Sequence, residues 1–234
     1  MIKPGQRPGL YARYGKRALD VAVSGTALLA LAPVLIGIGA ATRVAMGTPV
    51  LYKQRRPGRA GRVFTILKFR TMTDVVRPDG TPRSDNERIT RFGEWLRSTS
   101  MDELPELINV FRGDMSLVGP RPLLVKYLSL YDQRQHKRHA VRPGLTGLAQ
   151  VSGRNCLDWL VRLELDVRYV ETISVLSDLR ILLRTVSTTL RREGIAEPGQ
   201  STMSEFTGSP QRDADPVIDG RDAPVDDGVM SSEM

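Results

Sequence analysis

The 234-residue sequence is poor in cysteine, histidine and aromatic residues. A single cysteine, Cys156, excludes an internal disulfide framework and is typical of a protein from a reducing compartment. The only two histidines, His136 and His139, lack the Cys/His spacing of a zinc site, so a metal role for them is not favoured. The sequence also lacks a Walker A loop, a Rossmann glycine pattern and an internal repeat, so none of these motifs indicates a function.

The charge is distributed unevenly along the chain. The formal net charge is +8, but residues 195–234 carry nine acidic and two basic residues, which leaves 32 basic and 17 acidic residues, or +15, in residues 1–194. A basic body predicts an anionic partner, which is nucleic acid, acidic lipid or a phosphorylated substrate. Nucleic acid is disfavoured because no known nucleic-acid-binding module is present. Residues 195–234 are rich in Gly, Pro, Ser and Asp, and we expect an acidic disordered tail.

Residues 21–42 form a long run without a charged side chain. A straight helix of this length measures ~33 Å and would span a bilayer core. Pro33 lies in the middle and is expected to break the helix. Basic residues lie on both sides of the run and favour a helix–break–helix over residues 16–48 that re-enters the cytoplasmic leaflet, with both termini cytoplasmic. A straight transmembrane helix, a cleaved signal peptide and a buried soluble helix are the alternatives.

Two adjacent carboxylates, Asp102 and Glu103, precede a proline. Because Pro105 is tolerated only in the first turn of a helix, the pattern predicts a helix from about Asp102 to Arg112, with Gly113 ending it. A helix N-terminus stabilises ionised carboxylates and also attracts phosphate. The segment therefore suits a nucleophilic carboxylate beside a phosphate site.

A structural interpretation of the same dyad is also open. Acidic residues are common in first turns, and Ser100 with Glu103 fits a capping box. The functional interpretation is favoured by the neighbouring segment, because residues 113–122 form a glycine- and proline-fixed turn that carries Arg121.

The remaining pattern predicts short strands and several helices. Alternating and β-branched residues indicate strands at 50–52 and 63–70, separated by a basic turn at 54–58. Apolar periodicity indicates helices over 89–96, 123–139, 158–172 and 178–192. The last two have both an apolar face and basic residues, so they are core-facing helices, helices lying on an anionic membrane surface, or both.

Six motifs in order resemble one known family. They are Lys16-Arg17-x-x-Asp20, Gln54-x-Arg56-x-Gly58, Lys68-Phe69-Arg70-Thr71-Met72, Asp102-Glu103-Leu104-Pro105, the run from Gly113 to Pro122, and Gly153-Arg154-Asn155. Each is weak alone, but together they resemble the bacterial sugar transferases, which are monotopic polyprenyl-phosphate glycosyl-1-phosphate (phosphoglycosyl) transferases. The resemblance covers residues 16 to about 194. The chain departs from it at Ala32, where the family often has serine, and at residues 46–49.

The resemblance implies a reaction and a cofactor. A sugar-1-phosphate would pass from a UDP-sugar to undecaprenyl phosphate at the cytoplasmic membrane, releasing UMP and starting the synthesis of an exopolysaccharide or another surface glycan. Asp102 would be the nucleophile and a ligand of Mg²⁺, and Glu103 would act as a base or an orienting carboxylate. We expect Lys68, Arg97, Arg121 and Arg154 to screen the phosphates, since guanidinium groups grip phosphate oxygens bidentately.

The sequence thus predicts an α-rich α+β monotopic membrane protein. Its parts are a lead at 1–15, a re-entrant helix pair at 16–48, a cytoplasmic catalytic domain with a small strand element and amphipathic interfacial helices at 49–194, and a tail at 195–234. The competing hypothesis is a non-catalytic membrane-surface protein that binds anionic lipid or a glycan-assembly partner.

Overall fold

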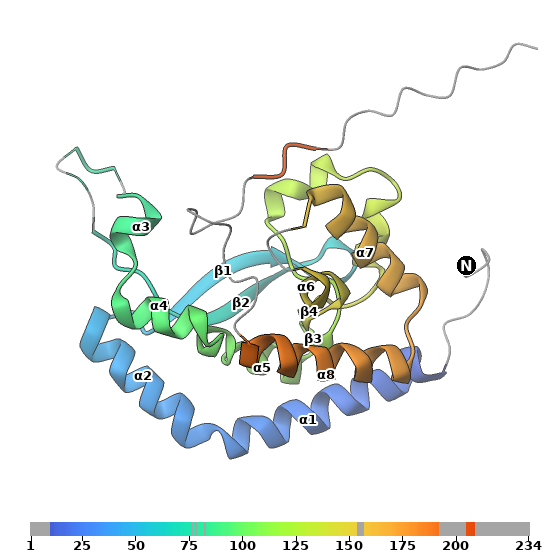
Figure 1. The fold of residues 1–234 in the computed structure, drawn as a ribbon, viewed down its shortest axis with the longest axis horizontal. Coiled ribbons are helices and arrows are strands. Elements are labelled where there is room, and N and C mark those ends of the chain that lie inside the picture. Colours follow the sequence, from blue (N-terminus) through green and yellow to red (C-terminus); the bar gives the residue numbers. More distant parts are fainter. Residues whose placement is uncertain are drawn as a thin grey trace, which may run out of the picture.

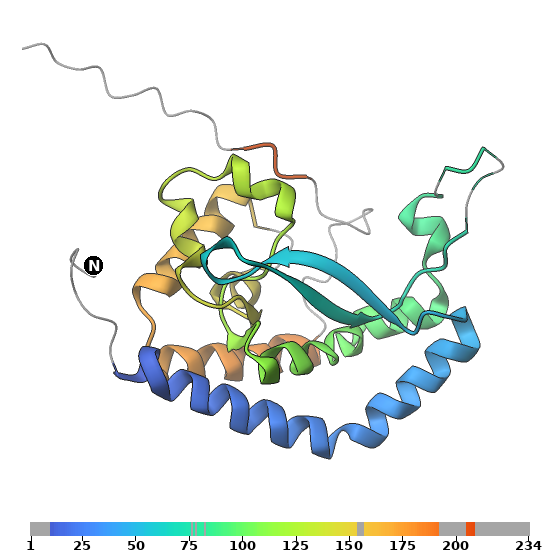
Figure 2. The same ribbon diagram turned by 180° about the vertical axis from the view of Figure 1, so that it is seen from behind.

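The computed structural model describes residues 10–75, 77, 79–81, 83–153, 157–191 and 205–208. Helices predominate, and the described strands form two small two-stranded sheets, which agrees with the predicted α+β class (Figure 1). The N-terminal helices α1 and α2 protrude as a bent pair from a domain that holds both sheets (Figures 1 and 2).

The described elements follow one another in this order: a π-helical turn at Tyr11–Gly15, α1 (Lys16–Ala30), α2 (Ala32–Met46), β1 (Leu51–Pro57), the 3₁₀ helix η2 (Arg59–Gly61), β2 (Val63–Phe69), α3 (Asp85–Arg88), α4 (Arg91–Ser98), the 3₁₀ helix η3 (Met101–Glu103), α5 (Glu106–Arg112), β3 (Ser116–Val118), the 3₁₀ helices η4 (Val125–Leu130) and η5 (Gln135–Ala140), β4 (Gly144–Thr146), α6 (Leu148–Ser152), α7 (Trp159–Glu171) and α8 (Val175–Arg191).

The apolar run folds as a helix–break–helix, as predicted. The helical segments Tyr11–Ala30 and Ala32–Met46 are bent by 63°. Leu31 leaves helical geometry at the break, and Pro33 lies in the first turn of α2, where its missing N–H costs no hydrogen bond. Within the described ranges no single helix is long and apolar enough to cross a membrane, whereas the bent pair together meets that requirement by length and composition.

Polar residues at the start of α1 fasten this helix to the domain. The Lys16 ammonium donates to Asp178 on α8 at 2.6 Å, and Arg17 donates to two backbone carbonyls at the C-terminus of α5. Asp20 accepts hydrogen bonds from the Ser116 hydroxyl at 3.0 Å and from a backbone N–H of β3. The sequence pattern marked Lys16, Arg17 and Asp20 as a family motif and as the basic flank of the membrane segment, and the structure adds their role as anchors of α1.

The first sheet is an antiparallel hairpin of β1 and β2. The strand predicted at 63–70 is confirmed, but β1 continues through residues 54–57, so the turn predicted at 54–58 is wrong and the chain reverses at 58–62 instead. Charged side chains are tolerated on β1 because it is an edge strand. Asn109 of α5 covers the other edge, since it accepts from the Leu67 N–H and donates to the Thr65 carbonyl.

The main core lies between this hairpin, α5 and the second sheet. Ile66, Leu107, Val110, Met115 and Val118 are buried together. The second sheet pairs β3 with β4 in parallel, and the two backbones approach so closely there that a Cβ at Gly144 would lie 2.1 Å from the backbone of Gly119. This packing fixes the backbone that leads from β3 to Arg121.

The helix predicted over 123–139 is wrong. The chain forms two short 3₁₀ helices there, η4 and η5, separated by a turn in which Asp132 accepts a hydrogen bond from the Gln135 N–H. Aspartate side chains that bond to the nearby backbone compete with helix formation. The helix predicted over 89–96 lies at 91–98 instead, where Thr90 caps α4.

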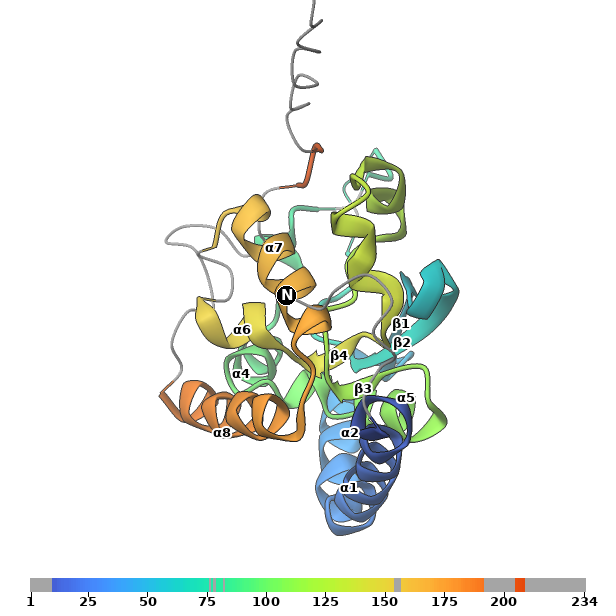
Figure 3. The same ribbon diagram turned by 90° about the vertical axis from the view of Figure 1, so that its right-hand side faces the viewer.

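Both predicted C-terminal helices are present. Asp158 caps α7 by accepting from the Leu160 N–H. The helix α8 begins at Val175, ahead of Asp178, which is buried and does not cap it. One face of α8 packs inward through Ile181, while large apolar side chains on the rest of its surface are exposed: Val175, Leu176, Leu179, Leu183 and Val186. This helix lies on the side from which α1 and α2 protrude (Figure 3).

Four residues of the predicted disordered tail are described, at 205–208, and they meet the domain through Phe206. Phe206 is buried among the aromatic rings of Tyr127, Tyr131 and Trp159. Its backbone N–H donates to the Tyr127 hydroxyl at 3.3 Å. Phe206 thus anchors these four residues in the aromatic cluster. The rest of 195–234 lies outside the described residues, so the disordered tail stays a prediction.

Candidate active site

Two of the predicted cations converge on one of the predicted carboxylates. Lys68, near the end of β2, and Arg121, after β3, both contact Glu103, which ends η3. The ammonium and guanidinium nitrogens lie 2.5 and 2.6 Å from Glu103 Oε1. A third carboxylate, Glu106 in the first turn of α5, lies 3.2 Å from the same ammonium group. Asp102 is buried beside this cluster.

The backbone around the dyad differs from the prediction. Ser100 adopts a left-handed conformation with φ of 57°, and Met101–Glu103 form a 3₁₀ turn. Pro105 is the N-cap, so α5 begins at Glu106, whereas its end at Arg112 with a left-handed Gly113 is as predicted. The helix start predicted at Asp102 is therefore wrong, and Ser100 makes no side-chain cap.

Glu103 is held ionised. The positive charges of Arg121 and Lys68, together with their hydrogen bonds, keep the pKa of Glu103 far below its usual range despite the cost of burial. A carboxylate with so low a pKa is a poor proton acceptor at neutral pH. The arrangement therefore favours the orienting role for Glu103 over the role of a base.

Asp102 has the opposite electrostatic environment. Burial and the adjacent negative charge of Glu103 raise the pKa of Asp102 from 3.8 to about 6, against the lowering effect of Lys68, Arg97 and Arg121. The sequence pattern predicts that a helix N-terminus keeps this group ionised. The structure reverses the direction because α5 begins only four residues later, so desolvation outweighs the dipole.

Glu106 is a site residue that the sequence analysis missed. It is almost fully buried, and burial together with the charge of Glu103 raises its pKa to about 7. Glu106 could have been identified from the sequence. It lies four residues after Asp102 and three after Glu103, and residues at these spacings share a helix face. Asp102 and Glu106 therefore both have a pKa close to neutral pH.

The other two predicted cations have different outcomes. Arg97 lies at the end of α4, donates to the Thr71 hydroxyl at 3.0 Å, and is close enough to Asp102 to lower its pKa. Arg154 lies outside the described residues. Gly93 sets the position of α4, because a Cβ there would lie 1.9 Å from the Thr71 carbonyl oxygen.

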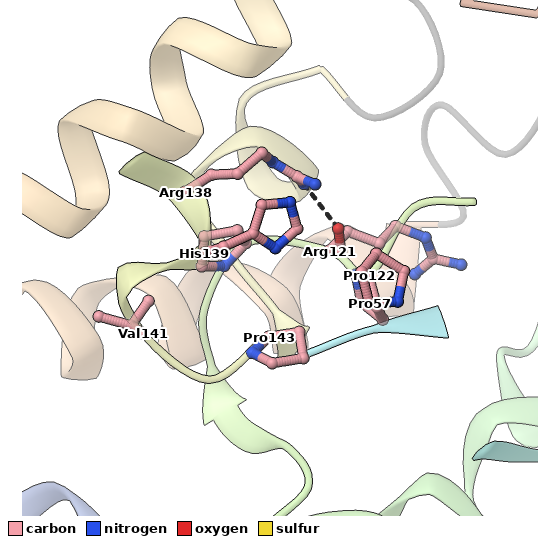
Figure 4. A pocket seen from close by; sticks show the side chains of 8 residues that line it. Pro57, Arg121, Pro122, Arg138, His139, Val141 and Pro143 are labelled. Carbon is pink, nitrogen blue, oxygen red and sulfur yellow. Dashed lines mark hydrogen bonds between the residues drawn. The ribbon is translucent and has the colours of Figure 1, made fainter. Parts of the chain in front are cut away.

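The backbone of Arg121 is held from behind by a buried ion pair. Arg138 donates to the Arg121 carbonyl at 2.7 Å and to Asp166 of α7 at the same distance. A void of about 10 Å³ lies beside this contact, lined in part by His139, while the Arg121 guanidinium points away from it (Figure 4). Arg138 and Asp166 therefore fix the backbone from which Arg121 reaches Glu103.

The carboxylates fit a magnesium site in part. Mg²⁺ is usually bound by one or two carboxylates together with substrate phosphates. Glu103 is already engaged by two cations, and Asp102 makes no ion pair with any described residue, so Asp102 is the carboxylate that remains for a metal. Within the described part of the chain no cluster of three His, Cys, Asp or Glu side chains is suited to a metal ion.

Comparison with known proteins assigns the family. The model of the bacterial sugar transferase family matches residues 11–192. An uncharacterized sugar transferase, EpsL, of Bacillus subtilis is 46% identical over 83% of this chain and 96% of its own length. The exopolysaccharide production protein ExoY of Rhizobium meliloti is 39% identical over 73% of this chain and 83% of its own.

A third relative has a named reaction. The UDP-glucose:undecaprenyl-phosphate glucose-1-phosphate transferase of Caulobacter vibrioides is 40% identical over 81% of this chain and 75% of its own. The chain belongs to the bacterial sugar transferase family and is a phosphoglycosyl transferase. The hypothesis of a non-catalytic membrane-surface protein is thereby set aside.

The raised pKa of Asp102 predicts a stability change with pH. A carboxyl whose pKa is 3.8 in the unfolded chain and about 6 in the folded protein lowers the stability of the fold as pH rises between these two values, by at most roughly 3 kcal/mol in total. In magnesium-free buffer we expect the melting temperature of Asp102→Asn to lie close to that of the wild type at pH 4 and to exceed it by several degrees at pH 8. Melting curves at both pH values measure this, and an equal difference at both would contradict it.

Proposed function

We propose that the protein transfers a sugar-1-phosphate from a UDP-sugar to undecaprenyl phosphate and releases UMP, with Asp102 as the nucleophile. The observation that carries the proposal is the cluster of Lys68, Arg121 and Arg97 around two carboxylates of different character. One, Glu103, is held ionised by cations, and the other, Asp102, has no ion-pair partner among the described residues. The named reaction of the Caulobacter relative supports the same chemistry.

The first step is an attack on the phosphorus that bears the sugar. An Asp102 carboxylate oxygen forms a bond to that phosphorus, the bond from phosphorus to the bridging oxygen breaks, and UMP leaves with the electron pair. The product is a phosphosugar linked to Asp102 as an acyl phosphate. Two anions approach each other in this step, so it requires positive charge, which Arg121, Lys68 and Arg97 supply.

The second step returns the enzyme to its starting state. An oxygen of undecaprenyl phosphate attacks the same phosphorus, and the bond to Asp102 breaks with release of its carboxylate. The product is undecaprenyl diphospho-sugar. Glu103 holds Lys68 and Arg121 in place through both steps, and Glu106 gives the Lys68 ammonium a second carboxylate contact. Asp102 would be the ligand of a bound Mg²⁺, which would supply further charge neutralisation on the phosphates.

The same proposal places the protein on the cytoplasmic membrane. The bent pair α1–α2 enters the inner leaflet and returns, and both termini stay cytoplasmic. Exposed apolar side chains on α8, on the same side of the domain, face the lipid together with Phe111 of α5. A lipid-borne acceptor then reaches the site from the membrane surface. The product starts an exopolysaccharide or another surface glycan, in line with the ExoY relative.

The reaction is tested by incubating the purified protein with Mg²⁺, undecaprenyl phosphate and a panel of UDP-sugars. Release of UMP that depends on both one donor and the acceptor lipid supports the proposal and identifies the sugar. If no UDP-sugar in the panel gives UMP with an acceptor lipid present, the proposed reaction is wrong.

The membrane placement predicts different depths for three positions. In a Cys156→Ser background, single cysteines replace Leu29 next to the break, Leu183 on α8 and Leu160 on α7, each carrying a polarity-sensitive fluorophore. We expect mid-chain nitroxide lipids to quench the label at 29 and headgroup nitroxides to quench the label at 183, with neither quenching the label at 160.

Two outcomes would contradict the placement. Equal quenching at 183 and 160 would remove α8 from the membrane surface. Reaction of a cysteine at 29 with an impermeant reagent supplied only on the far side of the vesicle would show a spanning segment instead of a re-entrant one.

A further inference from the structure

The register of the hairpin places a second arginine on the face of the sheet that carries Lys68. Residue 52 pairs with Lys68 and Arg56 pairs with Phe64, so Tyr52, Gln54 and Arg56 share one face with Lys68. This is the face that packs toward α5, where Lys68 meets Glu103 and Glu106. Arg55, next to Arg56, points to the opposite face and is exposed.

Arg56 is more enclosed than a surface arginine, and it is incompletely satisfied. One guanidinium nitrogen donates to Gln54 at 2.6 Å. Its Nε–H is buried and meets no acceptor among the described residues, and Arg56 makes no ion pair with any of them. A buried donor without an acceptor is destabilising, and an enclosed charge without a counter-ion is more so.

The neighbours of Arg56 make its electrostatic environment still less favourable. Burial and the positive charge of Arg121 are the two largest influences on Arg56, and both lower its pKa. Arg121 in turn shares Glu103 with Lys68, so one carboxylate is divided between two cations before Arg56 is counted. Glu106 is close enough to act on Arg56, but burial favours its neutral form.

We propose that Arg56 and Arg121 form a phosphoryl-binding pair that receives a phosphate oxygen of the substrate. The inference rests on the proposed function. An anionic oxygen would give the Arg56 Nε–H its missing acceptor and would relieve the repulsion between two neighbouring guanidinium groups. The phosphate belongs either to the donor diphosphate or to the lipid phosphate, and the two sources differ in which Michaelis constant depends on Arg56.

The experiment compares Arg56→Gln and Arg56→Lys with Arg55→Gln, a matched loss of one charge on the opposite face. The KM for the UDP-sugar and the KM for undecaprenyl phosphate are measured separately for each variant. We expect Arg56→Gln to raise one of the two at least tenfold, Arg56→Lys to recover part of the loss, and Arg55→Gln to change both less than twofold. A rise in the donor KM assigns the pair to the diphosphate, and a rise in the acceptor KM assigns it to the lipid phosphate.

A binding measurement that needs no turnover separates this proposal from the reaction. UDP and inorganic pyrophosphate should raise the melting temperature of the wild type and of Arg55→Gln, but not that of Arg56→Gln. This result would support the pair even if no UDP-sugar were turned over. Equal stabilisation of Arg56→Gln and Arg55→Gln, together with unchanged KM values for both substrates, would overturn it. If Arg56→Gln does not fold, Arg56→Lys serves in the same comparison.

Discussion

Replacing Asp102 with asparagine should lower UMP release by roughly 10³-fold or more. The substitution keeps the side-chain volume but removes the carboxylate oxygen that forms the bond to phosphorus, and losses of a nucleophile are typically of this size or larger. The fold should survive, because burial already favours the neutral form of this group, whose pKa is raised to about 6.

The sharpest readout uses the donor alone. Without undecaprenyl phosphate, the wild type should release UMP in a burst no larger than one equivalent per enzyme and should retain the labelled sugar on the protein in a form that hydroxylamine releases. Asp102→Asn should show neither. Asp85→Asn, at a partly exposed aspartate of α3, is the control for loss of one negative charge. A full burst from Asp102→Asn would disprove the proposed nucleophile.

Glu103→Gln should have the second largest effect, a loss of roughly 10²–10³-fold in kcat. Among the described residues, Glu103 is the one carboxylate that contacts both Lys68 and Arg121, at 2.5 and 2.6 Å. A neutral amide leaves these cations repelling each other and able to pair with Asp102 instead, which would occupy the nucleophile. Removing one partner from a partly buried ion network typically costs several kcal/mol of interaction.

Two further variants test whether the loss of activity depends on the position of the carboxylate or only on the loss of one negative charge. Glu106→Gln should cost less than about tenfold, since Glu106 contacts Lys68 alone and at the longer distance of 3.2 Å. Glu94→Gln, on the exposed face of α4, should cost nothing. Equal losses in Glu103→Gln and Glu106→Gln would contradict the orienting role, and a loss that external weak bases restore would favour a proton-transfer role for Glu103 instead.

Much of the fold followed from local patterns. The uncharged run with Pro33 determined a broken helix, because proline cannot occupy a helix interior. Gly113 determined the end of α5, since its left-handed conformation suits glycine. The alternation at 63–70 determined β2, and Asp158 determined the start of α7. In each case the deciding interactions are within a few residues of one another.

The errors arose where distant contacts override local preference. The segment 123–139 has helical periodicity, but Tyr127 and Tyr131 belong to an aromatic cluster with Trp159 and Phe206 that two short 3₁₀ helices suit better. The segment 54–58, with two arginines followed by Pro57-Gly58, was predicted as a turn, but residues 54–57 extend β1 because β2 offers its backbone hydrogen bonds. A partner strand or an aromatic pocket is not visible in a window of ten residues.

The sequence by itself determined the family, the dyad and the bent helix, because these depend on residue types at fixed spacings along the chain. Only the tertiary structure decided the electrostatics of the site. Lys68 and Arg121 lie 53 positions apart, and their convergence on Glu103 depends on how β2 and β3 pack against α5. The same packing buries Asp102 and places Arg56 beside Arg121, and burial and neighbouring charge are what set the pKa of each group.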